Sequence, residues 1–371
     1  MARGRRDGLL IAGGGIAGCL AALAIARFRP EIDLLIVEER GQFGGDGHHL
    51  FFDDEIGPEA RPLLAPLVEH HWPGYYVAFP GFSRKLKAGC SMFGPAAIHR
   101  QMLASLKPGQ YRLGTKVVAV REDSLVLDGG ETVKADGAID ARGAANQSLL
   151  ELLYETRIER GYRTRKPHGV DRPVLVDATV DGASGLRFVQ VVPLAGDRLL
   201  LAEVSISERV QPDPQAADRL DDYVALRGWD GASEDMPQAS TRPLPYGGDF
   251  DAFWRIGGAR VARLGLRGGM LHPLTGRTVA DAADAAMLLI RQNSFDGPQL
   301  HDVVEDEAKR LWRQREPLRG LVAGIAAAAP EARLGLLERL FRLDPALLAR
   351  VIAGRLTLLD RGRVQRAMRD T

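Results

Sequence analysis

Three glycines near the amino terminus have the spacing of a phosphate-binding turn. Gly13, Gly15 and Gly18 form the pattern G-x-G-x-x-G between an apolar run at 9–12 and an alanine-rich segment at 16–27. Such glycines let the chain turn tightly, let its backbone approach a pyrophosphate, and let the next helix pack closely on the strand. The free N–H groups and the dipole at the start of that helix favour a bound anion.

An acidic residue, Glu38, follows a second apolar run at 33–37. It stands about 20 residues beyond the glycine pattern, where a carboxylate can accept hydrogen bonds from ribose hydroxyls. Strand, glycine turn, helix, second strand and acid have the order of one βαβ unit. This order predicts a dinucleotide-binding site, whereas the glycines alone would also fit a structural turn.

Two later segments favour FAD over NAD as the dinucleotide, because they return the chain to the cofactor as in flavoprotein oxidoreductase-type folds. The first, residues 138–143, reads as a strand that rejoins the first sheet. We expect Asp140 and Gly143 at its end to contact the cofactor.

The second segment, residues 265–276, leads into a helix that begins near Thr278. We expect Pro273 and Gly276 in this turn to lie near the flavin ring or the ribityl phosphate. The alternative is a plain proline–glycine turn before a helix. A second glycine motif after a strand is missing from the sequence, so we expect no separate NAD(P)H domain.

The composition is that of an ordinary globular protein. Of the 371 residues, 45% are apolar and 26% are charged, which suggests roughly two domains. The 49 basic and 48 acidic residues leave a net charge of +1, so we expect no nucleic-acid partner. Cys19 and Cys90 are the only cysteines, which excludes a disulfide framework and fits a reducing compartment. Neither cysteine has metal ligands at a recognisable spacing, and we expect no metal.

The hydropathy pattern predicts no membrane-spanning segment. Three arginines precede the first apolar run, but the glycines at 13–15 interrupt it too early for a signal peptide. Every apolar run is shorter than the ~18 residues of a transmembrane helix. We expect a cytoplasmic protein, soluble or peripheral on the inner face of the membrane, and the sequence leaves the oligomeric state open.

The remaining pattern predicts a mixed α/β chain. Helices are expected at 94–106, 213–226 and 278–291, a small meander at 111–133, and antiparallel strands at 174–180, 186–192 and 198–203. The short turns of these strands are at 181–182 and 196–197. Beyond residue 299 the pattern is helical, divided by Pro317, Pro330 and Pro345.

These elements predict a Rossmann-type FAD-binding α/β domain with an inserted antiparallel β substrate domain and a helical C-terminal part. The FAD-binding domain is expected to be discontinuous, at 1–60, 94–150 and 255–298. The substrate domain is expected at 61–93 and 151–254, and the helical region at 299–371.

Motifs along almost the whole chain resemble those of bacterial lycopene β-cyclases. The most specific are HHWPGY at 70–75 and DATV at 177–180. The others are IAGGG at 11–15, APLVE at 65–69, RKL at 84–86, PHG at 167–169, RFV at 187–189, DAFW at 251–254, GLR at 265–267, HP at 272–273 and AGRLT at 353–357.

The resemblance implies an FAD enzyme that closes β-ionone rings on a linear carotene without net oxidation. NAD(P)H would reduce the flavin without being consumed stoichiometrically. An acidic group would protonate the terminal double bond, and reduced flavin would stabilise the carbocation. Such chemistry needs an apolar tunnel for a carotenoid-like molecule and a buried carboxylic acid that stays protonated.

The chain departs from the family at the residues expected to be catalytic. The family signature Phe-x-Gly-x-Glu, counted back from Pro167, falls here on Arg157, Glu159 and Gly161. Of the family's Glu-Asp-Thr-x-Tyr strand, one acid remains, as Glu203. The family tyrosine after Pro-x-Thr-Gly is Arg277, and Asn-His-Thr-Trp is replaced by DGHH at 46–49.

Two acids remain as catalytic candidates. Glu203 alternates with apolar residues on a strand, so it faces either the tunnel or solvent. Glu159 lies two residues before the lost family acid, which on a strand keeps the same face. The alternative for Glu159 is that it belongs to an exposed charged run at 155–165.

Four neighbouring histidines and one isolated histidine need separate interpretation. In the pairs at 48–49 and 70–71, adjacent side chains on an extended chain point to opposite faces, which is poor geometry for chelation. His70, His71 and Trp72 are interpreted as structural or tunnel-lining. His272 is interpreted as a residue that orients the second turn.

An apolar stripe at helical spacing, residues 334–341, either packs on the protein or docks on a membrane surface. Three functions remain open. The first is a carotenoid cyclase, the second a flavin-dependent oxidoreductase that acts on an apolar isoprenoid or another small molecule, and the third a homologue that has lost the cyclase activity.

Overall fold

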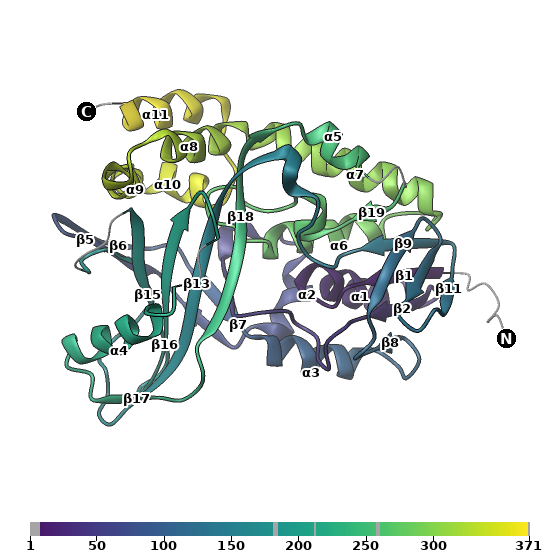
Figure 1. Ribbon diagram of the computed structural model, residues 1–371, viewed down its shortest axis with the longest axis horizontal. Helices are drawn as coiled ribbons and strands as arrows, with labels where there is room; N and C mark the ends of the chain where they lie inside the picture. Colours follow the sequence, from purple (N-terminus) through teal and green to yellow (C-terminus); the bar gives the residue numbers. More distant parts are fainter. Residues whose placement is uncertain (1–7, 181–184, 211–212, 257–259, 370–371) are drawn as a thin grey trace.

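The computed structural model describes residues 8–180, 185–210, 213–256 and 260–369. Its elements form a parallel sheet with helices, a large mixed sheet, and a group of C-terminal helices that cover one face of the large sheet (Figure 1). The turn expected at 181–182 lies outside the described residues. The proposed division into domains stays a prediction.

The parallel sheet has the strand order β19-β12-β1-β2-β8. Its strands are β1 (Gly8–Ala12), β2 (Asp33–Val37), β8 (Tyr111–Arg112), β12 (Gly137–Asp140) and β19 (Ala262–Arg263). The central strands β1 and β2 are continuously apolar because both faces of the sheet are covered. The expected strands at 9–12 and 33–37 and the strand that returns at 138 are confirmed.

Two layers cover this sheet. Helices α1 (Ile16–Phe28) and α6 (Val279–Ile290) pack together on one face, where Leu9, Ile11 and Ile36 point. The meander β9 (Val117–Arg121), β10 (Ser124–Leu127) and β11 (Thr132–Lys134) covers the other face, where Leu10 and Leu35 point. The result is the three-layer arrangement expected of a Rossmann-type domain.

Short elements connect the parallel sheet to the large sheet. Strands β3 (His49–Phe52), β4 (His70–Trp72) and β7 (Cys90–Phe93) form a three-stranded sheet in the order β3-β7-β4. The helices on this path are α2 (Arg61–Leu64) and α3 (Pro95–Ser105). Both cysteines are free and buried.

The large sheet has the order β17-β13-β16-β15-β14-β5-β6, and β18 pairs with β13. Its strands are β5 (Tyr75–Phe79), β6 (Phe82–Leu86), β13 (Leu150–Thr164), β14 (Val174–Asp177), β15 (Leu186–Ala195), β16 (Arg198–Ser207), β17 (Gly231–Ser233) and β18 (Gln238–Gly248). Helix α4 (Ala216–Leu226) covers one face. The C-terminal helices cover the other face, which we call the inner face.

The charged segment 155–165 is exposed only at Arg163 and Arg165, so the interpretation of Glu159 as part of an exposed run was wrong. Glu155 and Glu159 lie in β13, where they are only 8% and 4% exposed. Their charges are balanced by arginines on the same face of the sheet. Arg157 Nε lies 3.0 Å from Glu159 Oε2, and Arg242 of β18 lies 3.6 Å from Glu155. Pairing therefore lets a strongly charged sequence form a buried strand.

The C-terminal region is helical, as expected. Helix α5 (Phe250–Arg255) lies before this region. The helices of the region are α7 (Gly297–Gln314), α8 (Glu316–Ala327), α9 (Arg333–Phe341), α10 (Pro345–Ile352) and α11 (Leu358–Arg369). Pro317 and Pro345 lie in the first turns of α8 and α10, where proline costs no hydrogen bond. The apolar stripe at 334–341 lies in α9 and packs inward, since Leu337, Leu340 and Phe341 are buried in the core; we call it the α9 stripe. Within the described ranges, no helix has the length and apolarity to cross a membrane.

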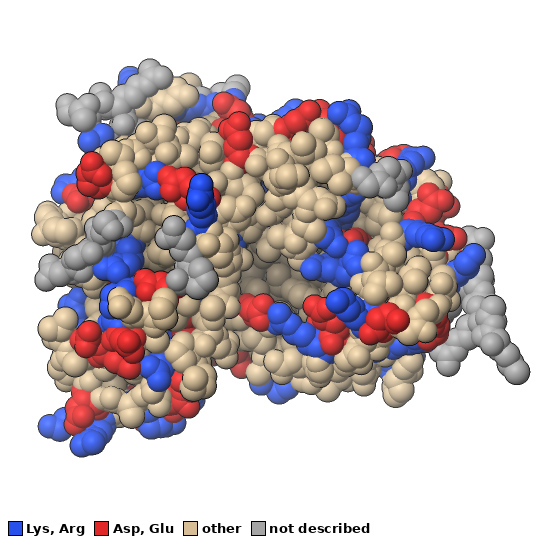
Figure 2. Space-filling model, viewed as in Figure 1, with Lys and Arg blue, Asp and Glu red and all other residues tan. Residues whose placement is uncertain are grey.

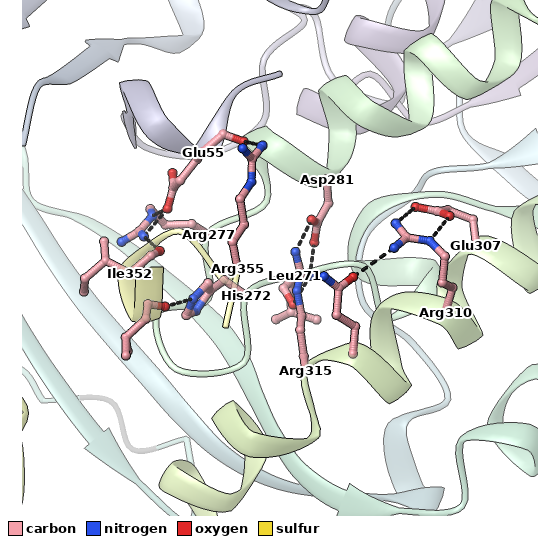
Figure 3. Close-up of polar contacts among 12 residues, drawn as sticks. Glu55, Leu271, His272, Arg277, Asp281, Glu307, Arg310, Arg315, Ile352 and Arg355 are labelled. Carbon is pink, nitrogen blue, oxygen red and sulfur yellow. Dashed lines mark hydrogen bonds and ion pairs between the residues drawn. The ribbon is translucent and has the colours of Figure 1, made fainter. Parts of the chain in front are cut away.

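Buried ion pairs join these helices to the rest of the protein (Figure 3). Arg315, at the junction of α7 and α8, contacts both carboxylate oxygens of Asp281 in α6 at 2.6 Å. Arg315 also donates to the carbonyl of Leu271. Glu307 and Arg310 form a similar pair within α7, but Arg310 is half exposed.

These two pairs predict different effects on stability. Asp281→Asn should lower the free energy of unfolding by about 3 kcal/mol, because it leaves the Arg315 charge buried without its carboxylate. Glu307→Gln, the matched control, should cost less than about 1 kcal/mol. Urea unfolding followed by circular dichroism measures both values. Equal losses for the two variants would contradict the assignment.

Candidate functional site

A cavity of about 580 Å³ lies at the carboxyl ends of the parallel strands β1, β2 and β12, and we call it the glycine-turn cavity. This is the edge at which ligands bind in parallel α/β sheets. Figure 2 shows a hollow near the middle of the molecule, with basic side chains on its rim. The residues that line the cavity include Gly13, Gly15, Glu38, Arg40, Lys116, Arg142 and Gly143 from the first 143 residues, and Arg242, Arg267, Gly276 and Arg277 from later segments.

The three glycines of the first turn have different surroundings. Gly13 has a φ of 101°, and a Cβ there would lie 2.6 Å from the carbonyl oxygen of Ala141. A Cβ at Gly18 would lie 1.9 Å from the carbonyl oxygen of Gly13, so helix and turn are in direct backbone contact. A Cβ at Gly15 would meet nothing within 4 Å. Gly15 therefore offers open backbone at the start of α1, where a phosphate would bind.

Glu38 lines the same cavity from the end of β2. Its carboxylate accepts hydrogen bonds from the backbone N–H of Gly14 at 2.5 Å and of Arg40 at 3.0 Å. These bonds fix the carboxylate beside the glycine turn. It lies where a ribose next to the bound phosphates could reach it.

Asp140 is buried and is not among the described residues that line the cavity. It accepts hydrogen bonds from Arg142 and from Arg267 Nε, at 2.8 and 2.9 Å. Burial opposes its ionisation, but the bond from Arg142 and the charges of both arginines hold the pKa of Asp140 below its usual range. Asp140 therefore positions two basic residues that line the cavity, and the expected direct contact with a cofactor is not supported.

The second turn contributes unequally to the cavity. Gly276 lines it and precedes the start of α6. Pro273 does not line it, and instead borders a small separate cavity beside Trp312. His272 donates from Nε2 to the carbonyl of Val351 at 2.9 Å, and burial holds its pKa well below the usual value. His272 therefore ties this turn to α10, as Figure 3 shows.

A second cavity, of about 120 Å³, lies between the inner face of the large sheet and the C-terminal helices, and we call it the inner cavity. Its helical wall is apolar and includes Leu337, Leu340 and Phe341 of α9 and Ile352 of α10. Its sheet wall is mixed, with apolar side chains such as Phe188 and Val192 beside the polar Glu155, Arg157, Gln190 and Arg242. The two cavities share Leu50, Arg242 and Arg277, so they are adjacent.

The adjacent histidines His48 and His49 face different cavities. His48 lines the inner cavity, whereas His49 lines the glycine-turn cavity. Burial lowers the pKa of His49 to about 4. The other pair, His70 and His71, is not among the described residues that line either cavity.

Glu159 lies between His48 and Arg157 on the inner face of the sheet. His48 Nδ1 contacts Glu159 Oε1, and Arg157 Nε donates to Oε2 at 3.0 Å. Burial opposes ionisation, but the hydrogen bonds and charges of these two neighbours hold the pKa of Glu159 to about 2. The expected buried carboxylic acid that stays protonated is therefore not found at Glu159, which is a carboxylate paired with an imidazole.

Gly161, at the position of the lost family acid, lies beside Asp235. Its N–H donates to Asp235 Oδ1 at 2.9 Å, and a Cβ there would lie 3.3 Å from Oδ2. Glu159, two residues earlier, is not among the described residues that line either cavity, but it contacts His48, which lines the inner cavity.

Glu203 lies on the opposite face of the large sheet, beneath α4. Arg219 of α4 binds its carboxylate and also binds Asp213. The flanking residues Leu199 and Leu201 face the same core as α4. Glu203 is not among the described residues that line either cavity, so its position does not support a catalytic role.

Sequence reasoning missed His48, Arg242 and the pair Arg142 and Arg267 as site residues. Arg142 and Arg267 each precede a glycine in the segments 142–143 and 265–268, and this was the available signal in the sequence. One group of possible metal ligands, His301, Asp302 and Glu305, lies elsewhere. It is held by protein partners, since Arg260 binds Asp302 and Lys309 binds Glu305.

Known proteins of one family are similar in sequence to nearly the whole chain. The family model described as "Lycopene cyclase protein" matches residues 8–369. The chain is 32% identical to the lycopene beta-cyclase of Pantoea ananas over 358 residues, which cover 96% of this chain and 93% of that protein. It is 30% identical to the lycopene beta-cyclase of a Paracoccus species, with 96% and 92% covered.

Solved structures with a similar fold are more distant in sequence. A flavin-dependent brominase has a TM-score of 0.62 at 13% identity, with 98% of both chains covered. A geranylgeranyl bacteriochlorophyll reductase-like protein from Thermoplasma acidophilum has a TM-score of 0.61 at 12% identity, with 97% of this chain and 96% of that chain covered. These likenesses show the fold.

The open surroundings of Gly15 predict a separation of binding from folding. Gly15→Val should fold with nearly unchanged stability but should weaken FAD binding at least ~10-fold, because the side chain occupies the space next to the helix start. Gly13→Ala should instead lower stability, because of its positive φ and its contact with Ala141. Fluorescence titration and thermal unfolding measure the two effects. Unchanged FAD affinity in Gly15→Val would argue against a phosphate at this turn.

The paired state of Glu159 predicts a pH-dependent contribution to stability. Its pKa of about 2 in the folded state lies below the ordinary glutamate value of about 4.3. The unfolded chain therefore binds more protons between these values, so the stabilisation is present above about pH 4.3 and is lost as the pH falls towards 2. Wild type should exceed Glu159→Gln in unfolding free energy at pH 6, and by less at pH 3. A difference that grows on acidification would refute this.

Proposed function

The chain belongs to the lycopene cyclase family, and we propose on this premise that it is an FAD-dependent enzyme that closes a ring at the end of a linear carotenoid such as lycopene. The reaction is an isomerisation, in which a proton enters at a terminal double bond and another leaves after ring closure. FAD would supply electron density against the cationic intermediate. NAD(P)H would keep the flavin reduced without being consumed in each turnover.

The observation that carries the proposal is the contact between the two cavities. The glycine-turn cavity has the open helix start at Gly15, the carboxylate of Glu38 and the basic pair Arg142 and Arg267, which together suit the sugar and phosphates of a dinucleotide. The inner cavity has the apolar wall that a hydrocarbon requires. The shared boundary would bring the cofactor and the end of the substrate next to each other.

We propose that His48 and Glu159 together supply the proton. Glu159 holds the Nδ1 side of the imidazole, and Arg157 holds Glu159. His48 lines the inner cavity and is 30% exposed, so it can contact both the substrate and a source of protons. His48 would be the catalytic acid, and Glu159 would stabilise its protonated form.

The size of the inner cavity limits how the substrate binds. A volume of about 120 Å³ accommodates part of one end group, and a long polyene must extend beyond it. Because α9 and α10 form the apolar wall, we propose that these helices shift when the substrate enters. We also propose contact with the membrane surface, where a carotenoid partitions, although the α9 stripe is already used for packing.

The alternative is a flavin-dependent oxidoreductase that acts on an apolar isoprenoid. The polar residues on the sheet side of the inner cavity favour it, because a pure hydrocarbon has no group to pair with Arg242, which lies 3.6 Å from its nearest carboxylate. The two reactions differ in cofactor use, since an oxidoreductase consumes NAD(P)H stoichiometrically.

Expression in a lycopene-accumulating bacterium tests the proposal. Wild type should convert lycopene to β-ring products, seen by chromatography of the pigments. His48→Gln and Glu159→Gln should slow conversion at least ~100-fold, the usual loss of a general acid. Glu203→Gln, which changes an acid on the other face of the sheet, should convert normally. Unchanged lycopene in cells that contain folded, yellow wild-type protein would contradict the cyclase and lead to the alternative.

A further inference from the structure

Arg242 of β18 lines both cavities, and its guanidinium has few interaction partners within the protein. It lines the glycine-turn cavity and the inner cavity. Its one ionic partner in the described part of the chain is Glu155, whose Oε1 lies 3.6 Å from Nη1. This distance is too long for a hydrogen bond.

The other arginines that line the glycine-turn cavity are closely paired. Arg142 and Arg267 share Asp140, at 2.8 and 2.9 Å. Arg277 donates to Glu55 from Nε at 3.0 Å, and Arg40 lies 2.9 Å from Asp46. Among the arginines that line the cavity, Arg242 therefore has the least neutralised charge.

The surroundings of Arg242 make this incomplete pairing costly. Its side chain is 21% exposed. Burial lowers its pKa, although a guanidinium remains charged at neutral pH. A cation in such a place is normally matched by an anion or by strong acceptors. The missing acceptor is therefore expected from a molecule that occupies the cavity.

The position along the cavity indicates which part of a dinucleotide this acceptor belongs to. Glu38 and Lys116 lie beside the glycine turn, where the adenosine half with its ribose would bind. Arg242 lies at the boundary with the inner cavity, together with Leu50 and Arg277. The reactive ring of the cofactor must reach this boundary in order to meet a substrate.

We propose that Arg242 donates to the pyrimidine edge of the flavin and that its charge stabilises the reduced, anionic cofactor. A positive charge near this edge favours the reduced form, because reduction places negative charge there. The inference rests on the flavin cofactor of the proposed function but does not depend on which reaction the enzyme catalyses. Arg242 would thus set how readily the flavin stays reduced.

The test is the midpoint potential of the bound flavin, measured by spectroscopic titration of the purified holoprotein against reference dyes. Arg242→Met should shift the balance at least tenfold towards oxidised flavin, which is about 30 mV more negative for a two-electron couple. Arg242→Lys should recover part of this shift. Glu155→Gln should move the potential in the positive direction, because it removes the counter-charge.

Lys116→Gln is the control, since it removes one positive charge from the other end of the same cavity. It should leave the potential unchanged. A wild-type potential in Arg242→Met, or a negative shift in Glu155→Gln, would overturn the proposal. Where Arg242→Met fails to fold, Glu155→Gln decides. The expected shift of the potential in a protein without cyclase activity would support this inference and count against the proposed cyclase function. A wild-type protein that binds no flavin would contradict both proposals.

Discussion

Pairing of buried charges holds together segments of this protein that are far apart in the chain. Arg277, in the second turn, binds Glu55, which lies 222 residues earlier. Glu159 of the large sheet binds His48, which lies 111 residues earlier. The pair of Arg277 and Glu55 takes two charges out of water, and such a pair is tolerated only while both partners are present. The two cavities meet where these pairs bring the second turn, β3 and the large sheet together.

The structure of residues 8–38 could be predicted from the sequence because local rules determine it. Gly13 and Gly18 of the glycine turn have a steric reason, and the apolar runs at 9–12 and 34–37 have both faces covered. The starts of α8 and α10 were visible as prolines. The strand β13 was not predicted, because the partners of its buried charges include residues far away in the sequence, such as His48 and Arg242.

The site residues show a similar division. Both faces of the large sheet are covered, so alternation in the sequence could not tell which face Glu203 occupies. The same ambiguity applied to Asp140, which lies beneath the arginines that line the cavity. For Glu159, the rule that a two-residue shift keeps the face of a strand was sufficient, and Asp235 accounts for the space beside Gly161. The chain thus retains a carboxylate on the inner face of the sheet, and the imidazole of His48 lies between it and the inner cavity.

The start of β3 lies between the two cavities: His48, just before the strand, lines one cavity, and His49, its first residue, lines the other. Alternation along a strand means that a shift of one residue exchanges the sides of all its side chains. Substitutions in the preceding DGHH segment can therefore accumulate during evolution, as they have in this chain. An insertion or deletion of a single residue there would send each histidine into the wrong compartment, so natural variants should keep the length of this segment even where they change its composition.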